Sequence, residues 1–80
     1  MPTVLRERGF RLFFYSDEGS PLEPCHVHVT KGDGEAEFWL GDEVAVAFNH
    51  CMNRRDLAMA MMIVRANRSA LERAWHGYFG

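Results

Sequence analysis

The chain has 80 residues, of which 48% are hydrophobic and 25% are charged, and its formal net charge is -2. This length predicts a single domain over residues 1–80, and the composition excludes a disordered chain. The small negative charge gives no whole-molecule argument for nucleic-acid binding, so any basic surface must be local.

Membrane and secreted classes are also disfavoured. No apolar run approaches the roughly 20 residues that a membrane-spanning helix needs, and the N-terminus lacks the pattern of a signal peptide. We therefore expect a cytoplasmic location. Cys25 and Cys51 are too few for a secreted disulfide scaffold, and we expect both to be free thiols.

The N-terminal segment predicts two strands. Thr3–Arg6 is a short candidate strand, and Glu7–Gly9 is a turn in which the glycine supplies a positive φ. Phe10–Tyr15 carries aromatic residues on both faces, which predicts a central strand that is covered at least partly on each side. Ser16–Glu23 has the composition of a loop.

Two alternating runs follow, His26–Thr30 and Glu35–Leu40. Their period of two is typical of half-buried strands, and the glycine-rich connection between them predicts a β-hairpin. The tip of its turn is either Gly32-Asp33 or Asp33-Gly34, and both choices give the same two faces. The face expected against the core carries Val27, Val29, Ala36, Phe38 and Leu40. The opposite face carries His26, His28, Thr30, Glu35, Glu37 and Trp39.

The next segment leads into a helix. Gly41-Asp42 is a turn, and Val44–Phe48 is either a strand or the start of a helix, with its valine and phenylalanine content favouring the strand. Asn53 is the predicted N-cap of a helix that starts at Arg54, and Asp56 stands where a capping box has its acidic residue.

Apolar residues then recur at spacings of three and four, which predicts an amphipathic helix as far as Phe79. The triplet Asn67–Ser69 either kinks this helix or splits it in two. The apolar stripe consists of Leu57, Met61, Val64, Leu71, Trp75 and Tyr78. The predicted fold is α+β, with an antiparallel three- to four-stranded sheet packed on one face by the C-terminal helix. The other face, with the histidines, is expected to be open or covered by a second chain.

Several segments together resemble the bacterial domain-of-unknown-function family 4160. The matching pieces are Met1–Leu5, Gly9–Ser16, Pro24 with His26–Val29, Ala36 with Phe38–Leu40, and Ala74–His76 with Tyr78–Gly80. Members commonly have a proline where Cys25 stands, so this cysteine is a local departure. Since such proteins are often encoded beside another small protein, the resemblance implies a partner and a toxin role in a toxin–antitoxin-like pair. It implies no catalytic residues.

The histidine pair carries the most suggestive chemistry. A His-x-His strand projects both rings to one side about 7 Å apart, which suits acid/base work on a phosphate. We therefore take His26, His28 and Glu37 as candidate catalytic residues of a metal-independent ribonuclease. The alternative is a plain sheet surface on which the histidines pack against Trp39 and bond to Glu37.

A metal site is a weaker alternative, and the leading hypothesis needs no metal and no cofactor. The candidate ligands are Cys25, His26, His28, His50 and Cys51. The usual spacings of a structural zinc site are absent, and Cys25 points away from His26 in a regular strand. If zinc binds, we expect His26 and His28 with a carboxylate.

Two further groups are candidates for contacts with other molecules. For a nucleic acid or phosphate they are Arg11, Lys31, Arg54, Arg65 and Arg68. Arg54, Arg65 and Arg68 are expected along one helical flank, although a solvated helix face with Asp56 and Glu72 is the alternative. For a protein interface the candidates are Met59, Met62, Tyr15 and Trp39.

The sequence thus predicts a small cytoplasmic protein that acts through protein–protein contact. The leading hypothesis is the toxin half of a toxin–antitoxin-like pair with RNA as its target, in which the partner is a small protein encoded nearby. The alternatives are a non-enzymatic homodimeric or regulatory binding module and, more weakly, a small zinc-binding protein.

Overall fold

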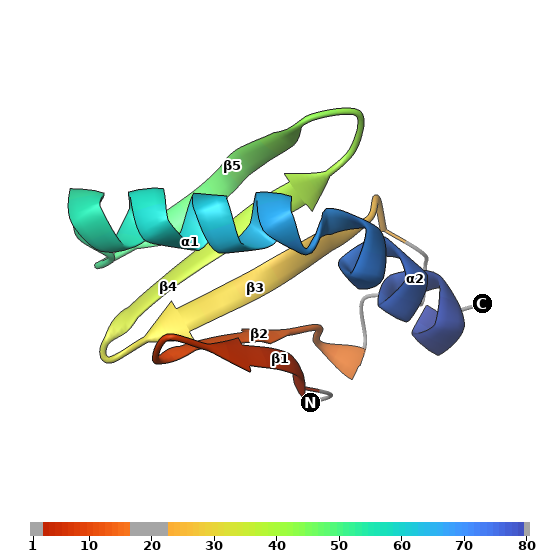
Figure 1. Ribbon diagram of the computed structural model, residues 1–80, viewed down its shortest axis with the longest axis horizontal. Coiled ribbons are helices and arrows are strands. Elements are labelled where there is room, and N and C mark those ends of the chain that lie inside the picture. The colour runs from red at the N-terminus through yellow and green to blue at the C-terminus, as the bar shows by residue number, and fades with distance from the viewer. Residues whose placement is uncertain (1–2, 17–22, 80) are drawn as a thin grey trace.

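The computed structural model describes residues 3–16 and 23–79, which form a five-stranded antiparallel sheet followed by two helices (Figure 1). The strands are β1 (Thr3–Glu7), β2 (Phe10–Phe13), β3 (His26–Lys31), β4 (Gly34–Leu40) and β5 (Val44–His50), and the helices are α1 (Arg54–Ala66) and α2 (Arg68–Phe79). Each strand pairs with its neighbour in sequence, so the order across the sheet is β1-β2-β3-β4-β5. The expected α+β class is confirmed, with five strands instead of three or four.

Two tight turns fix the sheet register. In the β1–β2 turn, Arg8 and Gly9 both have positive φ (52° and 84°), which is the requirement of a type I′ turn between twisted strands. In the β3–β4 hairpin Lys31 pairs with Gly34, so the tip is Gly32-Asp33. Gly32 takes a φ of 57°, as the first central residue of a type II′ turn does.

The C-terminal helical segment is divided into two helices at Asn67, within the triplet for which the sequence predicted a kink or a split. The Asn53 side chain accepts a hydrogen bond from the Asp56 N–H at 2.7 Å, so the predicted N-cap of α1 is confirmed. At the other end, the Asn67 side chain donates to the Ile63 carbonyl oxygen at 2.8 Å and to Glu7 of β1 at 3.4 Å. Because Asn67 leaves the helical path, α2 starts in a new direction.

Helix α1 crosses one face of the sheet and α2 continues past the end of the sheet where β3 begins (Figure 1), and the core lies between the helices and the sheet. Its buried residues include Leu12, Val27, Val29, Phe38, Ala60, Ile63, Val64, Leu71 and Trp75. The predicted apolar stripe is partly wrong, because Leu57 and Met61 are only half-buried and Tyr78 is exposed. Leu57 and Met61 lie beside Val46 of β5. This strand is an edge of the sheet, and within the described residues no further strand extends the sheet beneath them.

Two smaller expectations concern strands. Val44–Phe48 is part of a strand, as its composition favoured. The aromatic strand β2 ends at Phe13 instead of Tyr15, and it is covered on both faces, since Leu12 and Phe13 are both buried. The expected loop Ser16–Glu23 lies mostly outside the described residues.

Within the described residues, no helix combines the length and the apolar character that crossing a membrane requires.

Candidate functional site

The residues predicted to share the histidine face of the sheet do lie on one face. Across the β3–β4 pair, His26 stands opposite Trp39, His28 opposite Glu37, and Thr30 opposite Glu35. Cross-strand partners share a face, so both imidazoles, both carboxylates and the indole lie on the same side of the sheet. On β2, Phe13 pairs with His28 and adds an aromatic ring to this face.

The expectation of an open histidine surface is wrong, because the rings are almost completely covered. His26 is 1% exposed and His28 is 6% exposed. The helix α2 lies beyond the end of the sheet where β3 begins (Figure 1), so the Trp75 ring centroid approaches that of His26 to 5.0 Å. His28 is stacked on Phe13 at 5.4 Å and meets the edge of Tyr15 at 4.5 Å. Aromatic side chains from distant segments therefore cover both rings.

The polar contacts of His26 define the orientation of its ring. Its Nδ1 lies 2.7 Å from the carbonyl oxygen of Pro24, and since a carbonyl only accepts, Nδ1 carries the hydrogen. The other nitrogen, Nε2, lies 3.7 Å from a carboxylate oxygen of Glu37 and 3.9 Å from one of Glu23. A ring nitrogen of one histidine is thus directed toward two carboxylates.

His28 has a similar carboxylate neighbour. Its Nδ1 lies 3.4 Å from Oε2 of Glu35, and the Tyr15 hydroxyl donates to the same oxygen at 3.4 Å. Glu35 and Glu37 are both partly exposed. The side of the cluster that solvent reaches is therefore made of carboxylates and not of imidazoles.

Among the described residues, His26, His28 and Glu37 are the group whose metal-binding atoms come together, with one such atom from each lying within 4.8 Å of the others. The cysteines considered at the sequence level do not join them. Cys25 packs against the hydrophobic core, and Cys51 is exposed after β5 with a φ of 62°. Both are free thiols, as expected. Burial, followed by the nearby Glu72, raises the pKa of Cys25 to about 11, so its thiol stays protonated at neutral pH.

The candidate phosphate-binding residues do not form one patch. Arg11 donates to the Thr3 hydroxyl at 2.9 Å and lies 4.5 Å above the Phe13 ring, on the histidine face. Arg68 belongs to α2 and not to α1, and it is bound to the Gly41 carbonyl oxygen and paired with Glu72 at 3.5 Å. The expected common flank is thus interrupted at the junction of the helices, and two of its three arginines, Arg54 and Arg65, lie exposed on α1.

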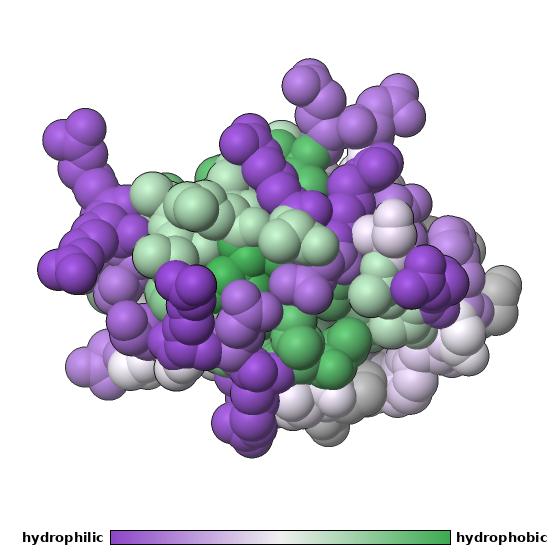
Figure 2. Space-filling model, viewed as in Figure 1, coloured by the Kyte–Doolittle hydropathy of each residue, from purple (hydrophilic) through white to green (hydrophobic). Residues whose placement is uncertain are grey.

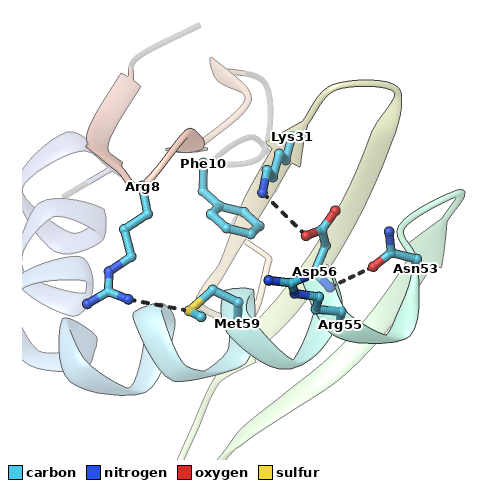
Figure 3. Close-up of a pocket in the computed structure, with 7 residues that line it drawn as sticks. All are labelled: Arg8, Phe10, Lys31, Asn53, Arg55, Asp56 and Met59. Atoms are coloured by element: carbon cyan, nitrogen blue, oxygen red, sulfur yellow. Dashed lines mark hydrogen bonds and ion pairs between the residues drawn. The ribbon is translucent and has the colours of Figure 1, made fainter.

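Lys31 lies on the other side of the sheet, at a cavity of about 410 Å³ (Figure 3). Its ammonium group is 3.3 Å from a carboxylate oxygen of Asp56 and lies over the Phe10 ring. Arg8 reaches across the same cavity toward the sulfur of Met59, 4.0 Å away. Lys31 and Arg8 thus contact α1 from the side of the sheet, and Arg55 of α1 is a third cation at this cavity.

Exposed apolar residues mark a second surface, which sequence reasoning missed. On β5, Val46 is 42% exposed and Phe48 is 52% exposed. Beside Val46, the strand and α1 enclose a groove of about 290 Å³. The groove is lined by Val46, Arg54, Leu57, Ala58 and Met61. The position of Val44–His50 as the last strand of a meander would have identified it as an edge.

The predicted interface residues lie on separate surfaces. Met62 is 62% exposed on α1, and Met59, half-buried, borders the smaller cavity beside it. Figure 2 shows apolar side chains over α1 and toward β1, between charged residues. Tyr15 and Trp39 lie instead on the histidine face, where Trp39 is 38% exposed.

A meander of five antiparallel strands with α1 on one face, a histidine–carboxylate cluster on the other and α2 at the end of the sheet defines a small α+β protein. The chain belongs to the family described as domain of unknown function DUF4160, whose sequence model matches residues 9–76. The resemblance read from the sequence is thereby confirmed. Comparisons with curated proteins and with solved structures found no match.

Proposed function

We propose that this protein is a binding module that acts through protein–protein contact, with the β5 edge as its contact strand. The observation that carries the proposal is an uncharged seven-residue edge strand on which two large apolar residues, Val46 and Phe48, are about half exposed. An edge strand offers a row of backbone donors and acceptors to another chain, and exposed apolar side chains add affinity to such a pairing.

The two edges of the sheet differ in a way that supports this assignment. The opposite edge, β1, has five residues, ends in the charged pair Arg6-Glu7, and has an irregular register between Thr3 and Leu5. Charges and bulges of this kind protect an edge from pairing. The strand β5 contains no Lys, Arg, Asp or Glu, so only the irregularity opposite Glu37 and Phe38 interrupts it.

A second copy of this chain is the occupant that we propose. Antiparallel pairing of two β5 strands about a two-fold axis brings no like charges together, because the strand is uncharged. The groove beside Val46 lies next to the same edge and offers Leu57 and Met61 for further apolar contact. A strand of a partner protein encoded nearby, as the family resemblance implies, is the competing occupant.

A toxin that cleaves RNA is the alternative function, and the geometry gives it less support. His26 and His28 are almost fully buried, whereas an acid/base pair must reach the substrate. The partly exposed groups beside them are the carboxylates of Glu35 and Glu37, which repel phosphates.

Light scattering coupled to gel filtration tests the proposal. We expect a dimer for the wild type, a monomer for Val46→Lys and Phe48→Lys, and an unchanged dimer for the control Met62→Lys. Each replaced side chain is exposed, so the variants should fold. If the wild type is a monomer that pairs with the neighbouring gene product through β5, the proposed occupant is that partner and not a second copy. Association that Met62→Lys abolishes and Phe48→Lys leaves intact would contradict the assignment of β5.

A further inference from the structure

We propose that His26, His28 and Glu37 form a binding site for a divalent transition-metal ion, with zinc as the ion that this donor set fits. Two imidazole nitrogens and one carboxylate oxygen lie within 4.8 Å of one another. Zinc sites with two histidines and one glutamate take the same donors and leave the fourth position to water or another ligand.

One distance in the group is close to the separation that coordination requires, and the others lie within 4.8 Å. Ligands bound at about 2.0–2.1 Å in a tetrahedron are separated from one another by roughly 3.3 Å. The His26 Nε2 and Glu37 Oε2 atoms are 3.7 Å apart, so only a few tenths of an ångström separate them from that geometry. Glu37 is partly exposed, which lets its carboxylate make the adjustment by side-chain rotation.

The hydrogen bond at one nitrogen of the His26 ring orients the ring in the way that is common for histidines that bind metals. Histidines that bind metals usually donate their second ring N–H to a backbone carbonyl or a carboxylate, which fixes the tautomer. The Nδ1 of His26 donates to Pro24 at 2.7 Å, and this makes Nε2 the nitrogen with the lone pair. At His28, a carboxylate oxygen of Glu35 lies 3.4 Å from Nδ1.

Local charge also favours a cation. Three carboxylates, those of Glu23, Glu35 and Glu37, lie within 3.9 Å of the two imidazoles. These carboxylates lie beside buried aromatic side chains, where a divalent ion is attracted to their negative charge. The aromatic rings of Trp39 and Trp75 limit the access of water to the His26 side of the site.

Calorimetric titration of chelator-treated, untagged protein with zinc chloride tests the site. We expect one ion per chain with micromolar or tighter affinity, and no heat with magnesium chloride, since magnesium prefers six oxygen ligands. Glu37→Gln keeps the shape of the side chain, so it should fold and weaken zinc binding by about 10-fold or more. Cobalt should give the visible absorption of a tetrahedral complex in the wild type and lose it in Glu37→Gln.

Two exposed histidines outside the cluster provide matched controls. His50→Ala and His76→Ala should bind zinc as the wild type does. Absence of stoichiometric zinc binding at tens of micromolar would overturn the proposal. Binding that survives Glu37→Gln and disappears in His50→Ala would overturn it equally.

Discussion

The Cα atom of Met52 lies 2.9 Å from the position that a Cβ atom would occupy on Gly34. The carbonyl oxygen of Cys51 is 3.1 Å from the same position, so the backbone between β5 and α1 crosses directly over the first residue of β4. Because both obstacles are backbone atoms, they cannot move aside as a flexible side chain does. The connection from the sheet to α1 therefore depends on a residue without a side chain at position 34.

Gly34→Ala should destabilise the fold. The added methyl group must displace the chain at Met52 or the strand, and overpacking of this kind costs about 1–3 kcal/mol. Urea denaturation followed by circular dichroism measures the loss. Gly41→Ala is the matched control, because nothing lies within 4 Å of its Cβ position. Equal stabilities of the two variants would contradict the close crossing.

Arg8→Asn should stabilise the protein. Arg8 has a φ of 52° at the first central position of a type I′ turn, which asparagine occupies far more readily than arginine. The exposed contact from Arg8 to the Met59 sulfur is a minor loss. We expect a gain of roughly 0.5–1 kcal/mol in unfolding free energy, read from the same urea curves. A decrease would show that the contact with Met59 outweighs the strain of the turn.

His28→Ala should lower stability, because the ring packs against both Phe13 and Tyr15. A cavity left by a buried ring of this size costs about 2–3 kcal/mol. His50→Ala removes an exposed ring and should change stability by less than about 0.5 kcal/mol. A thermal midpoint that His28→Ala leaves unchanged, together with loss of RNA cleavage, would restore the catalytic hypothesis.

The two cysteines should react at different rates. The raised pKa of Cys25 leaves almost no thiolate at pH 8, so iodoacetamide should label the exposed Cys51 first, as mass spectrometry can follow. Labelling of Cys25 as fast as Cys51 at pH 8 would contradict the raised pKa.

The same pKa shift predicts how stability depends on pH. The pKa of Cys25 rises from 9.0 to about 11, so between these values the unfolded chain releases a proton that the folded chain keeps. The contribution of Cys25 is therefore complete below pH 9 and is lost as the pH rises toward 11. Urea denaturation across this range should show stability falling less steeply for Cys25→Ala than for the wild type. Equal slopes would remove Cys25 as the source of the effect.

Much of the fold was predictable because its signals are local. Strict alternation in His26–Thr30 and Glu35–Leu40 sets which side chains share a face, and the glycines at the turns admit positive φ. The N-cap at Asn53 and the break at Asn67 are likewise short-range hydrogen-bond patterns. These features need only neighbouring residues, so the sequence alone determined the hairpin faces, the capping of α1 and the family.

What surrounds those faces was decided by tertiary structure. His26 is buried because Trp75, far along the chain, packs beside it at the end of the sheet, and no local pattern encodes that contact. Val46 and Phe48 are exposed because the strand order leaves β5 at an edge, although their apolar character alone predicts burial. Periodicity assigns a residue to a side of the sheet, but only the packing of distant segments determines whether that side meets solvent or another side chain.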